Sequence, residues 1–289
     1  MVSLFFVSLL NNTDTMKANT YLVPHDFTPV ADTATRMALE FAHLNNGSLV
    51  LIHIVDKKSD RKMAKEKFSE VLSQFSDADR GIIRTVVLEG DVYGDIGKAS
   101  EVLGASLIVM GTHGATGLQK IFGSRALKVV NSTGTPFMIT QGTGNLNEIK
   151  HIVMPFYFEK ETVQIATFAA DIAKMFKSTI HLVGFYDKDE WLHDKTKANQ
   201  LVLRRYFTDQ GIEHEIVNLP KEKSYEKELQ EYAASINADL FAVAHYNESV
   251  LTSASSFVQE LINNSHDIPV LTVNTEELTI TSGLSFLTI

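Results

Sequence analysis

The stretch Asn19-Thr-Tyr-Leu-Val-Pro-His-Asp-Phe-Thr28 returns later in the chain as Lys150-His-Ile-Val-Met-Pro-Phe-Tyr-Phe-Glu159. Each copy is a short apolar run with a proline near its carboxyl end. Each is followed by a segment whose apolar residues have helical spacing. Self-similarity at a fixed distance along the chain predicts a duplicated structural unit.

The similarity continues through the whole repeat. Three further pairs match: Ser48–Val55 with Ser178–Phe185, Gly104–Met110 with Asn237–Val243, and Gly134–Thr140 with Asp267–Val273. In this alignment His53 and His181 occupy matching strand positions, where we expect core or strand-end residues. We place a first domain at residues 17–142 and a second at 149–275, joined by a polar, glycine-rich linker.

Strands and helices are predicted to alternate in both repeats. In the first, strands are expected near 20–25, 48–55, 82–88, 106–111 and 136–140, and helices near 30–45, 59–76, 92–103 and 122–132. The second repeats this pattern, with a longer second helix at about 190–210. The near-continuous apolar runs are typical of strands buried on both faces. Alternation of this kind predicts an α/β fold with right-handed crossovers and a parallel sheet.

Composition narrows the class of protein. Apolar residues make up 44% of the chain, the formal net charge is −9, and the 26 basic residues form no cluster. This argues against a nucleic-acid partner and against binding to an anionic membrane surface. The absence of cysteine excludes disulfides, thiolate catalysis and cysteine-ligated metals.

The two ends of the chain lie outside the repeats. The apolar run Val2–Leu10 is too short to span a bilayer and lacks the flanks of a signal peptide. Either Met16 is the true start, or residues 1–16 form a disordered or docking extension. The tail at 276–289 is apolar enough to dock on a neighbouring surface. We expect a cytoplasmic protein.

The residues after each strand carry the candidate chemistry, because ligands of open parallel sheets bind beyond the carboxyl ends of the strands. The fourth strand of the first repeat is followed by Gly111-Thr-His-Gly114, and Gly123-Ser124 opens the next helix. Glycines allow close backbone approach, and a helix start offers unpaired N–H groups, so together they predict an anion site. Arg125 is either a countercharge or a surface residue. A lone G-x-x-G is also common in ordinary turns, and no P-loop lysine is present.

Other polar residues at this edge have two interpretations each. Asp26 either accepts hydrogen bonds from a ribose or base edge, or caps the following turn or helix. His113 either contacts a phosphate or is an exposed loop residue. Gly90-Asp91 is predicted to form the next turn on the same edge. No set of residues has metal-ligand spacing or acid–base pairing, so no catalytic residue is assigned.

The second repeat lacks this pattern. Ala244-His-Tyr-Asn247 stands in place of the first glycine pair, Ser256-Phe257 in place of Gly123-Ser124, and Tyr157 in place of Asp26. Added side chains obstruct a phosphate, so we expect at most one ligand per chain. The second repeat is either a degenerate copy kept for packing or a site for a different ligand or partner.

The chain resembles a tandem universal stress protein over residues 17–275. The resemblance is carried by Leu22-Val-Pro-His-Asp-Phe-Thr28, Ala105-Ser-Leu-Ile-Val-Met-Gly-Thr-His-Gly114, Gly123-Ser124 and Thr135-Pro-Phe137. It implies two open five-stranded sheets of order 3-2-1-4-5, each in a three-layer α/β/α sandwich of the adenine-nucleotide α-hydrolase type. This chain has eight residues between Gly114 and Gly123, where the family pattern has nine.

The resemblance also implies a ligand. It is ATP, or else ADP or AMP, with Mg²⁺ carried by the nucleotide. By resemblance, the site residues are Asp26, Val55, Met110, Gly111, Gly114, Gly123 and Ser124, with Val55 approaching the adenine. The implied function is an adenine-nucleotide-binding regulatory protein of the stress response. The alternatives are a nucleotide-independent interaction or scaffold protein and, third, a weak ATPase.

The sequence gives less information about contacts between the repeats and with other proteins than about the ligand. The two repeats are expected to pack through the edge strands Phe137–Thr140 and Val270–Val273. Whether two chains then form a homodimer is left open, and protein partners cannot be named.

Overall fold

The computed structural model describes residues 19–112, 122–142, 148–157, 159–185, 189–220, 224–246 and 254–276; among these, the side chains of 122–125, 160, 185 and 254–256 are not described. The chain divides into two compact units, unit 1 (Met1–Asn145) and unit 2 (Leu146–Ile289). Each unit is an α/β fold built on parallel strands.

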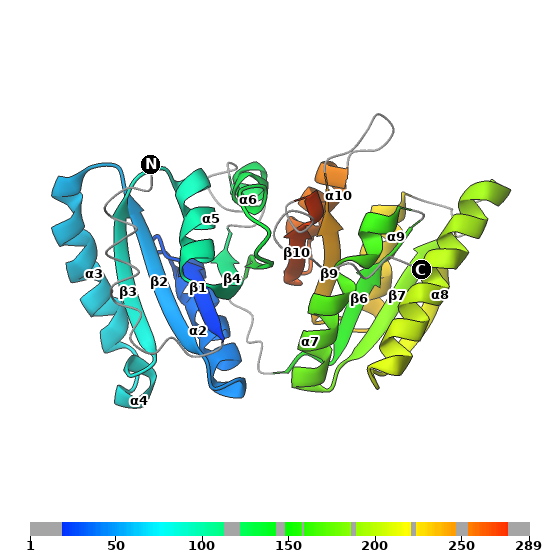
Figure 1. Ribbon diagram of the computed structural model, residues 1–289, viewed down its shortest axis with the longest axis horizontal. Helices are drawn as coiled ribbons and strands as arrows, with labels where there is room; N and C mark the ends of the chain where they lie inside the picture. Colours follow the sequence, from blue (N-terminus) through cyan, green and yellow to red (C-terminus); the bar gives the residue numbers. More distant parts are fainter. Residues whose placement is uncertain are drawn as a thin grey trace. The chain divides into compact units, whose positions relative to one another are not determined.

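The strands of unit 1 follow one another across the sheet in the order β3-β2-β1-β4-β5 (Figure 1). All neighbours are parallel. The strands are β1 Thr20–Pro24, β2 Ser48–Val55, β3 Ile83–Glu89, β4 Ala105–Gly111 and β5 Phe137–Thr140. This confirms the order that the family resemblance implies, and every strand end agrees with the sequence prediction to within one residue.

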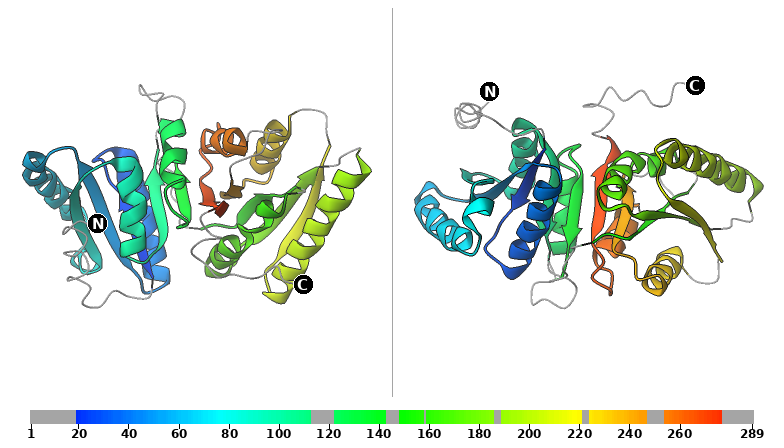
Figure 2. Two further views of the ribbon diagram at one scale, coloured as in Figure 1. Left: turned by 45° about the horizontal axis from the view of Figure 1, so that its top comes forward. Right: turned by 90° about the horizontal axis from the view of Figure 1, so that it is seen from below.

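Helices cover both faces of the unit 1 sheet, with α2 and α3 on one face and α5 and α6 on the other (Figure 2). Their bounds are α2 Pro29–Leu44, η1 Lys58–Asp60, α3 Arg61–Ser73, α4 Asp77–Arg80, α5 Val92–Val102 and α6 Phe122–Val130. This arrangement follows from right-handed crossovers, because β1 to β3 run one way across the sheet and β4 to β5 the other.

Helix α2 is placed by its sequence directly over the middle of the sheet. Pro29 stands in its first turn, where the fixed φ of proline suits a helix start. Ala34, Ala38 and Phe41 recur at helical spacing and are fully buried against β1 and β4. The small alanines let the helix approach the strands closely, which matters for the end of β4.

The helix predicted at 59–76 is found as α3, with the 3-10 turn η1 directly before it. A separate short helix, α4, follows and was not predicted. Ser76 starts it, because its hydroxyl accepts a hydrogen bond from the Asp79 N–H at 3.1 Å.

Unit 2 repeats the topology, with β6 in the place of β1 and the order β8-β7-β6-β9-β10. Its strands are β6 His151–Pro155, β7 Thr179–Phe185, β8 His214–Leu219, β9 Leu240–His245 and β10 Val270–Asn274. Its helices are η2 Lys160–Val163, α7 Ala166–Phe176, α8 Glu190–Asp209, α9 Tyr225–Ser235 and α10 Ala254–Ile262. The long second helix predicted at 190–210 is α8.

The first helix of unit 2 starts later than that of unit 1. Where α2 begins immediately after the β1 loop, unit 2 has η2 and only then α7. The hydroxyl of Thr162 donates to the carbonyl of Glu159 at 2.7 Å, which favours the tight turn over a regular helix start. The segment between β6 and β7 therefore contains the 3-10 turn η2 and then the helix α7.

Strand register corrects one pairing in the sequence alignment. Pro24 lies opposite Ile52, and Pro155 lies opposite Val183. With the two prolines superposed, His53 corresponds to Gly184, and His181 corresponds to Val50. The two histidines therefore do not occupy matching positions. Their similar sequence surroundings gave a misleading alignment, because β-branched runs look alike at several registers.

Candidate functional site

The candidate site of unit 1 is the edge of the sheet where β1, β2 and β4 end. β1 lies between the other two, and the direction of the crossovers reverses between β1 and β4. Such a switch point leaves a crevice beyond the carboxyl ends of the strands. Pro24, Val55 and Gly111 are the last residues of the three strands, so the segments that follow them meet there.

The loop from β1 to α2 is held in place by the backbone and the side chain of His25. Its backbone N–H donates to the Ile52 carbonyl at 2.8 Å, and Nδ1 of His53 lies 2.7 Å from the His25 carbonyl oxygen. Nε2 of His25, in a fully buried side chain, lies 3.2 Å from the Asp32 carboxylate. Burial lowers the pKa of His25, against the opposing attraction of Asp32 and Asp26. The loop is therefore anchored to β2 and to α2.

Asp26 is exposed at the tip of this loop. Its Oδ1 accepts hydrogen bonds from the Thr28 N–H at 3.1 Å and from the Thr28 hydroxyl. This is the capping arrangement that the sequence offered as one of two roles, and it orders the residues before α2. An exposed carboxylate held in place in this way also remains accessible from solvent.

Phe27 adopts a left-handed backbone conformation with φ of 65°. Phenylalanine rarely occupies this region, and a bulky residue there is strained. The turn directs the Phe27 ring inward while Asp26 stays on the outside. The ring centroid lies 4.6 Å from His53 and 5.0 Å from Phe68, so aromatic packing stabilises the unusual backbone.

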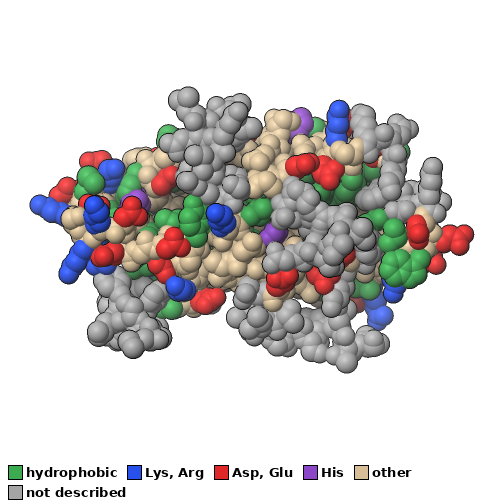
Figure 3. Space-filling view, turned by 90° about the horizontal axis from the view of Figure 1, so that it is seen from above, with side chains coloured by type: hydrophobic (Ala, Val, Ile, Leu, Met, Phe, Trp, Pro, Cys, Tyr) green, Lys and Arg blue, Asp and Glu red, His purple; other side chains and the backbone are tan. Residues whose placement is uncertain are grey.

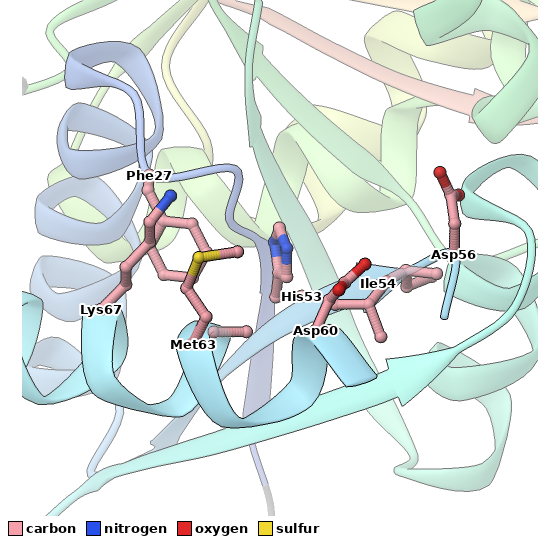
Figure 4. A pocket seen from close by; sticks show the side chains of 9 residues that line it. Phe27, His53, Ile54, Asp56, Asp60, Met63 and Lys67 are labelled. Atoms are coloured by element: carbon pink, nitrogen blue, oxygen red, sulfur yellow. The ribbon is translucent and has the colours of Figure 1, made fainter. Parts of the chain in front are cut away.

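A hollow of about 230 Å³ lies between the end of β2 and α3 (Figure 4). The ring of Phe27 and the imidazole of His53 lie on one side, and Met63 and Lys67 of α3 on the other. The ammonium of Lys67 is 5.2 Å from the Phe27 ring centroid, a cation–π distance. Val55, Asp56 and Asp60 complete the rim, so an aromatic floor is flanked by charges of both signs.

Val55 and Met110 are nearly buried, at 6% and 8% exposure. The carbonyl of Val55 accepts a hydrogen bond from the Gly90 N–H at 3.1 Å, which ties the end of β2 to the start of the β3–α5 turn. The structure thus places both residues at the predicted edge, where they offer apolar surface and backbone groups but no charge.

Gly111 has a packing role that the sequence did not show. A Cβ at this position would lie 2.3 Å from the carbonyl oxygen of Val30 and 3.0 Å from the N–H nitrogen of Ala31. The first turn of α2 therefore rests directly on the end of β4, and only glycine fits. This requirement exists without any ligand.

The remaining predicted site residues lie on α6 or before it. Gly123, Ser124 and Arg125 are in the first turn of α6, as predicted, but the side chains of Ser124 and Arg125 are outside the described part of the structure. Gly114 and His113 also fall outside the described residues.

One feature of this edge was missed in the sequence. Asp91 caps α5 by accepting from the Gly94 N–H at 2.9 Å, and Asp95 accepts from the Asp91 N–H at 2.9 Å. A Cβ at Gly90 would lie 2.1 Å from the carboxylate of Asp95. The pattern Asp-x-x-x-Asp at a helix start was the available signal, and the turn predicted at Gly90-Asp91 is confirmed.

The corresponding edge of unit 2 differs in side chains and in helix register. Ala244 stands in the place of Gly111, and Tyr157 in that of Asp26, as the alignment predicted. The helices α6 and α10 have equal length, and their buried residues match at an offset of 132: Ala126, Val129 and Val130 correspond to Val258, Leu261 and Ile262. Ser255 and Ser256 therefore correspond to Gly123 and Ser124.

This register corrects the expectation that Phe257 replaces the hydroxyl of Ser124. Phe257 corresponds to Arg125, and a serine is retained at the hydroxyl position. The alignment from the sequence was shifted by one because the turn after α10 is one residue longer than that after α6.

Among the described residues, no three His, Asp or Glu side chains gather in a way that could hold a metal ion. No helix in the same part of the chain is long and apolar enough to cross a membrane. On the face drawn in Figure 3, the coloured Lys and Arg side chains are scattered among acidic ones and form no patch.

Comparison with known proteins gives a family for unit 1. Residues 18–141 match the model of the universal stress protein family. Universal stress protein MJ0577 of Methanocaldococcus jannaschii is 22% identical over 151 residues, which cover 42% of this chain and 93% of that protein.

Solved structures extend the likeness of fold across both units. A universal stress protein from Archaeoglobus fulgidus is 21% identical, covers 89% of this chain and 99% of its own, and gives a TM-score of 0.71. A functionally unknown protein from Pseudomonas aeruginosa is 13% identical, covers 89% of this chain and 92% of its own, and gives a TM-score of 0.59. At these identities the likeness is one of fold.

Proposed function

Because residues 18–141 belong to the universal stress protein family, we propose that unit 1 binds one adenine nucleotide at the carboxyl edge of its sheet. In this proposal the protein regulates a stress response through its nucleotide occupancy and carries out little or no chemistry. The domain containing the site is the first repeat, residues 17–142.

One observation carries the proposal. Asp26, Val55, Met110 and Gly111, assigned from separate stretches of the sequence, lie at or next to the ends of three neighbouring strands, and Val55 also lines the hollow between β2 and α3. The hollow is smaller than the pockets of about 300–1,000 Å³ that enclose whole ligands, so it suits a ring system rather than an entire nucleotide. Its aromatic floor supports a planar base.

The other groups have complementary roles in this proposal. The exposed Asp26 carboxylate accepts hydrogen bonds from the ribose or the base. The backbone N–H groups at the start of α6, with Gly123, Ser124 and Arg125, receive the phosphates together with Gly114. Gly111 serves the packing of α2 and brings the backbone close to the ligand. Any Mg²⁺ arrives with the phosphates, because the described residues contain no cluster of metal ligands.

Calorimetric titration of the full chain with ATP, ADP and AMP tests the proposal. We expect one nucleotide per chain. Asp26→Ala is expected to weaken binding about 10- to 100-fold, because a hydrogen bond to a charged group contributes about 1.5–3 kcal/mol. Asp77→Ala, on the exposed helix α4, is the control and should bind as the parent does. Absence of binding by all three nucleotides at millimolar concentration would refute the proposal.

The alternative is a protein that interacts with partners independently of nucleotide. The closed edge of unit 2, described below, favours it, because half of the chain keeps the fold without a recognisable ligand site. Gly114→Val separates the two functions. If stress tolerance and partner binding persist after this change has abolished nucleotide binding, the alternative holds.

A further inference from the structure

The carboxyl edge of unit 2 contains an aromatic pair that unit 1 lacks. The rings of Tyr225, at the start of α9, and Phe257, in α10, are stacked with centroids 5.8 Å apart and planes 8° from parallel. The Tyr225 hydroxyl donates to the carbonyl of Val183, near the end of β7, at 2.7 Å. Both rings are half-buried.

Tyr225 lies close to the carboxyl ends of β6 and β7. Val183 lies opposite Pro155, so the hydroxyl reaches the end of β7 next to the end of β6. Burial raises the pKa of Tyr225 well above its usual range, and the nearby Glu226 and Tyr157 raise it further. Tyr157 is the residue in the place of Asp26. The ring thus lies among the ends of β6 and β7 and the start of α10.

Two of the three corresponding places in unit 1 carry candidate site residues. By strand register they carry Asp26 and Ile52, and by helix register Arg125. At the first position of α5, where α9 has Tyr225, unit 1 has Val92, which is exposed. Among the described residues, unit 1 thus has a small exposed side chain where unit 2 has an aromatic ring.

Further contacts close the edge of unit 2. The Asn199 side-chain amide, from α8, donates to the carbonyls of Tyr157 and Glu159 at 2.7 and 3.0 Å, which holds the loop after β6. Phe156 is buried, and a Cβ at Gly184 would lie 2.9 Å from its ring. The loop that carries Asp26 in unit 1 is therefore fixed from two sides in unit 2.

We propose that the ring of Tyr225 is a built-in occupant of the edge of unit 2 and fills the space that corresponds, in unit 1, to the one beside Asp26 and Arg125, where the proposed function puts the ribose and phosphates of the ligand. Its hydroxyl donates to the carbonyl of Val183, and the ring of Phe257 stacks on it. The edge of unit 2 is thereby always occupied by the protein's own side chain, so no nucleotide binds there or changes the conformation of this unit. The inference rests on the proposed function only for the identity of the ligand that Tyr225 replaces.

Two variants of the full chain, which restore the residues of unit 1, test this proposal. Tyr225→Val introduces the side chain of Val92, and the double variant with Phe257→Arg adds that of Arg125. The fluorescence of Trp191, the single tryptophan and part of α8, follows thermal unfolding of unit 2. Phenol and adenosine are the added probes. Tyr225→Phe, which loses only the hydroxyl, and Tyr93→Val in unit 1 are the controls.

We expect Tyr225→Val to lower the melting temperature by several degrees, and millimolar phenol to restore part of the loss by refilling the space. Adenosine should raise the melting temperature of the double variant. Neither probe should affect the parent, Tyr225→Phe or Tyr93→Val. An unchanged melting temperature, or phenol rescue without any response to adenosine, would show a packing residue only and overturn the proposal. If Tyr225→Val does not fold, Tyr225→Leu takes its place in the double variant with Phe257→Arg, and no response of that variant to adenosine overturns the proposal.

These outcomes are separable from those of the proposed function. Failure of nucleotide binding in unit 1 leaves the response of unit 2 to phenol unaffected. Failure of the phenol and adenosine experiments leaves the titration of unit 1 unaffected.

Discussion

Unit 1 and unit 2 share one strand order but fill the edge of the sheet in opposite ways. In unit 1, His25 and His53 occupy two neighbouring strand ends, and a hollow remains beside them. In unit 2 the same two positions carry Phe156 and Gly184, and the larger ring covers the missing side chain. Unit 2 has an apolar ring at one position and no side chain at the neighbouring one, so the ring fills the space beside the glycine.

A second difference lies on the sheet face that α9 covers. In unit 2, Nε2 of His181 lies 3.0 Å from Nδ1 of His151, and its Nδ1 lies 2.8 Å from the Tyr232 hydroxyl. The register places Val50 and Thr20 at the histidine positions of unit 1, and Ala99 at that of Tyr232. Unit 2 therefore has a polar network where unit 1 has mainly apolar packing.

The end of β4 is where the comparison predicts the largest effect. Gly111→Ala in unit 1 forces a Cβ against the carbonyl oxygen of Val30, so we expect a loss of about 1–3 kcal/mol in the free energy of unfolding. Unit 2 has Ala244 at this position, and there the 3-10 turn η2, and not the first turn of a regular helix, packs against β9. Urea denaturation followed by circular dichroism measures the loss.

Ala244→Gly is the matched variant. It removes no clash and costs about 0.5–1 kcal/mol through the flexibility of glycine. Equal losses in the two variants would mean that the helix start does not explain why the two units differ at this residue.

Much of this fold could be predicted from the sequence, because continuous apolar runs mark strands buried on both faces. The ends of β2 and the helix α5 were predicted closely for this reason. The clash at Gly111 could not be foreseen, because it depends on how near α2 comes to β4. Nor could the left-handed Phe27, since phenylalanine carries no signal for that conformation. The register of α10 was misread because a one-residue difference in a turn is invisible within a weak repeat.

The polar network of unit 2 gives the next largest effect. Tyr232→Phe removes the hydroxyl beside Nδ1 of the buried His181, so that nitrogen loses its hydrogen-bond partner at 2.8 Å. We expect a loss of about 1–2 kcal/mol in the free energy of unfolding. Tyr93→Phe in unit 1, where the ring faces the Lys128 ammonium, is the control. It should change the free energy of unfolding by only a few tenths of the loss expected for Tyr232→Phe. Chemical denaturation measures both losses. Similar losses for the two variants would mean that the polar network does not stabilise unit 2.

The starts of α5 and α9 provide a smaller contrast. The Asp91 side chain caps α5, whereas Ser224 at the start of α9 makes no such side-chain hydrogen bond. Asp91→Ala should therefore cost about 1 kcal/mol, and Ser224→Ala much less. Thermal melts of the two variants decide the point. A Ser224→Ala loss as large as that of Asp91→Ala would indicate that the serine caps the helix in solution.

The smallest expected effect is the contribution of the His25 titration to stability, which appears only as the pH falls below neutral. Burial holds the pKa of the folded His25 below its ordinary 6.5, so below pH 6.5 the unfolded chain binds a proton that the folded chain excludes. Stability must therefore fall as the pH drops through 6.5 toward the folded pKa. His25→Phe, which introduces the residue of unit 2, should reduce this slope, and the loss of the contacts with Asp32 and the Phe27 N–H should lower stability by an amount that does not depend on the titration of the imidazole. Some slope remains, because burial also lowers the pKa of His181 and His245 in unit 2. The reciprocal Phe156→His should steepen the slope. Urea titrations between pH 5 and 7.5 measure both, and parallel slopes in parent and His25→Phe would show that the buried imidazole takes up its proton without cost.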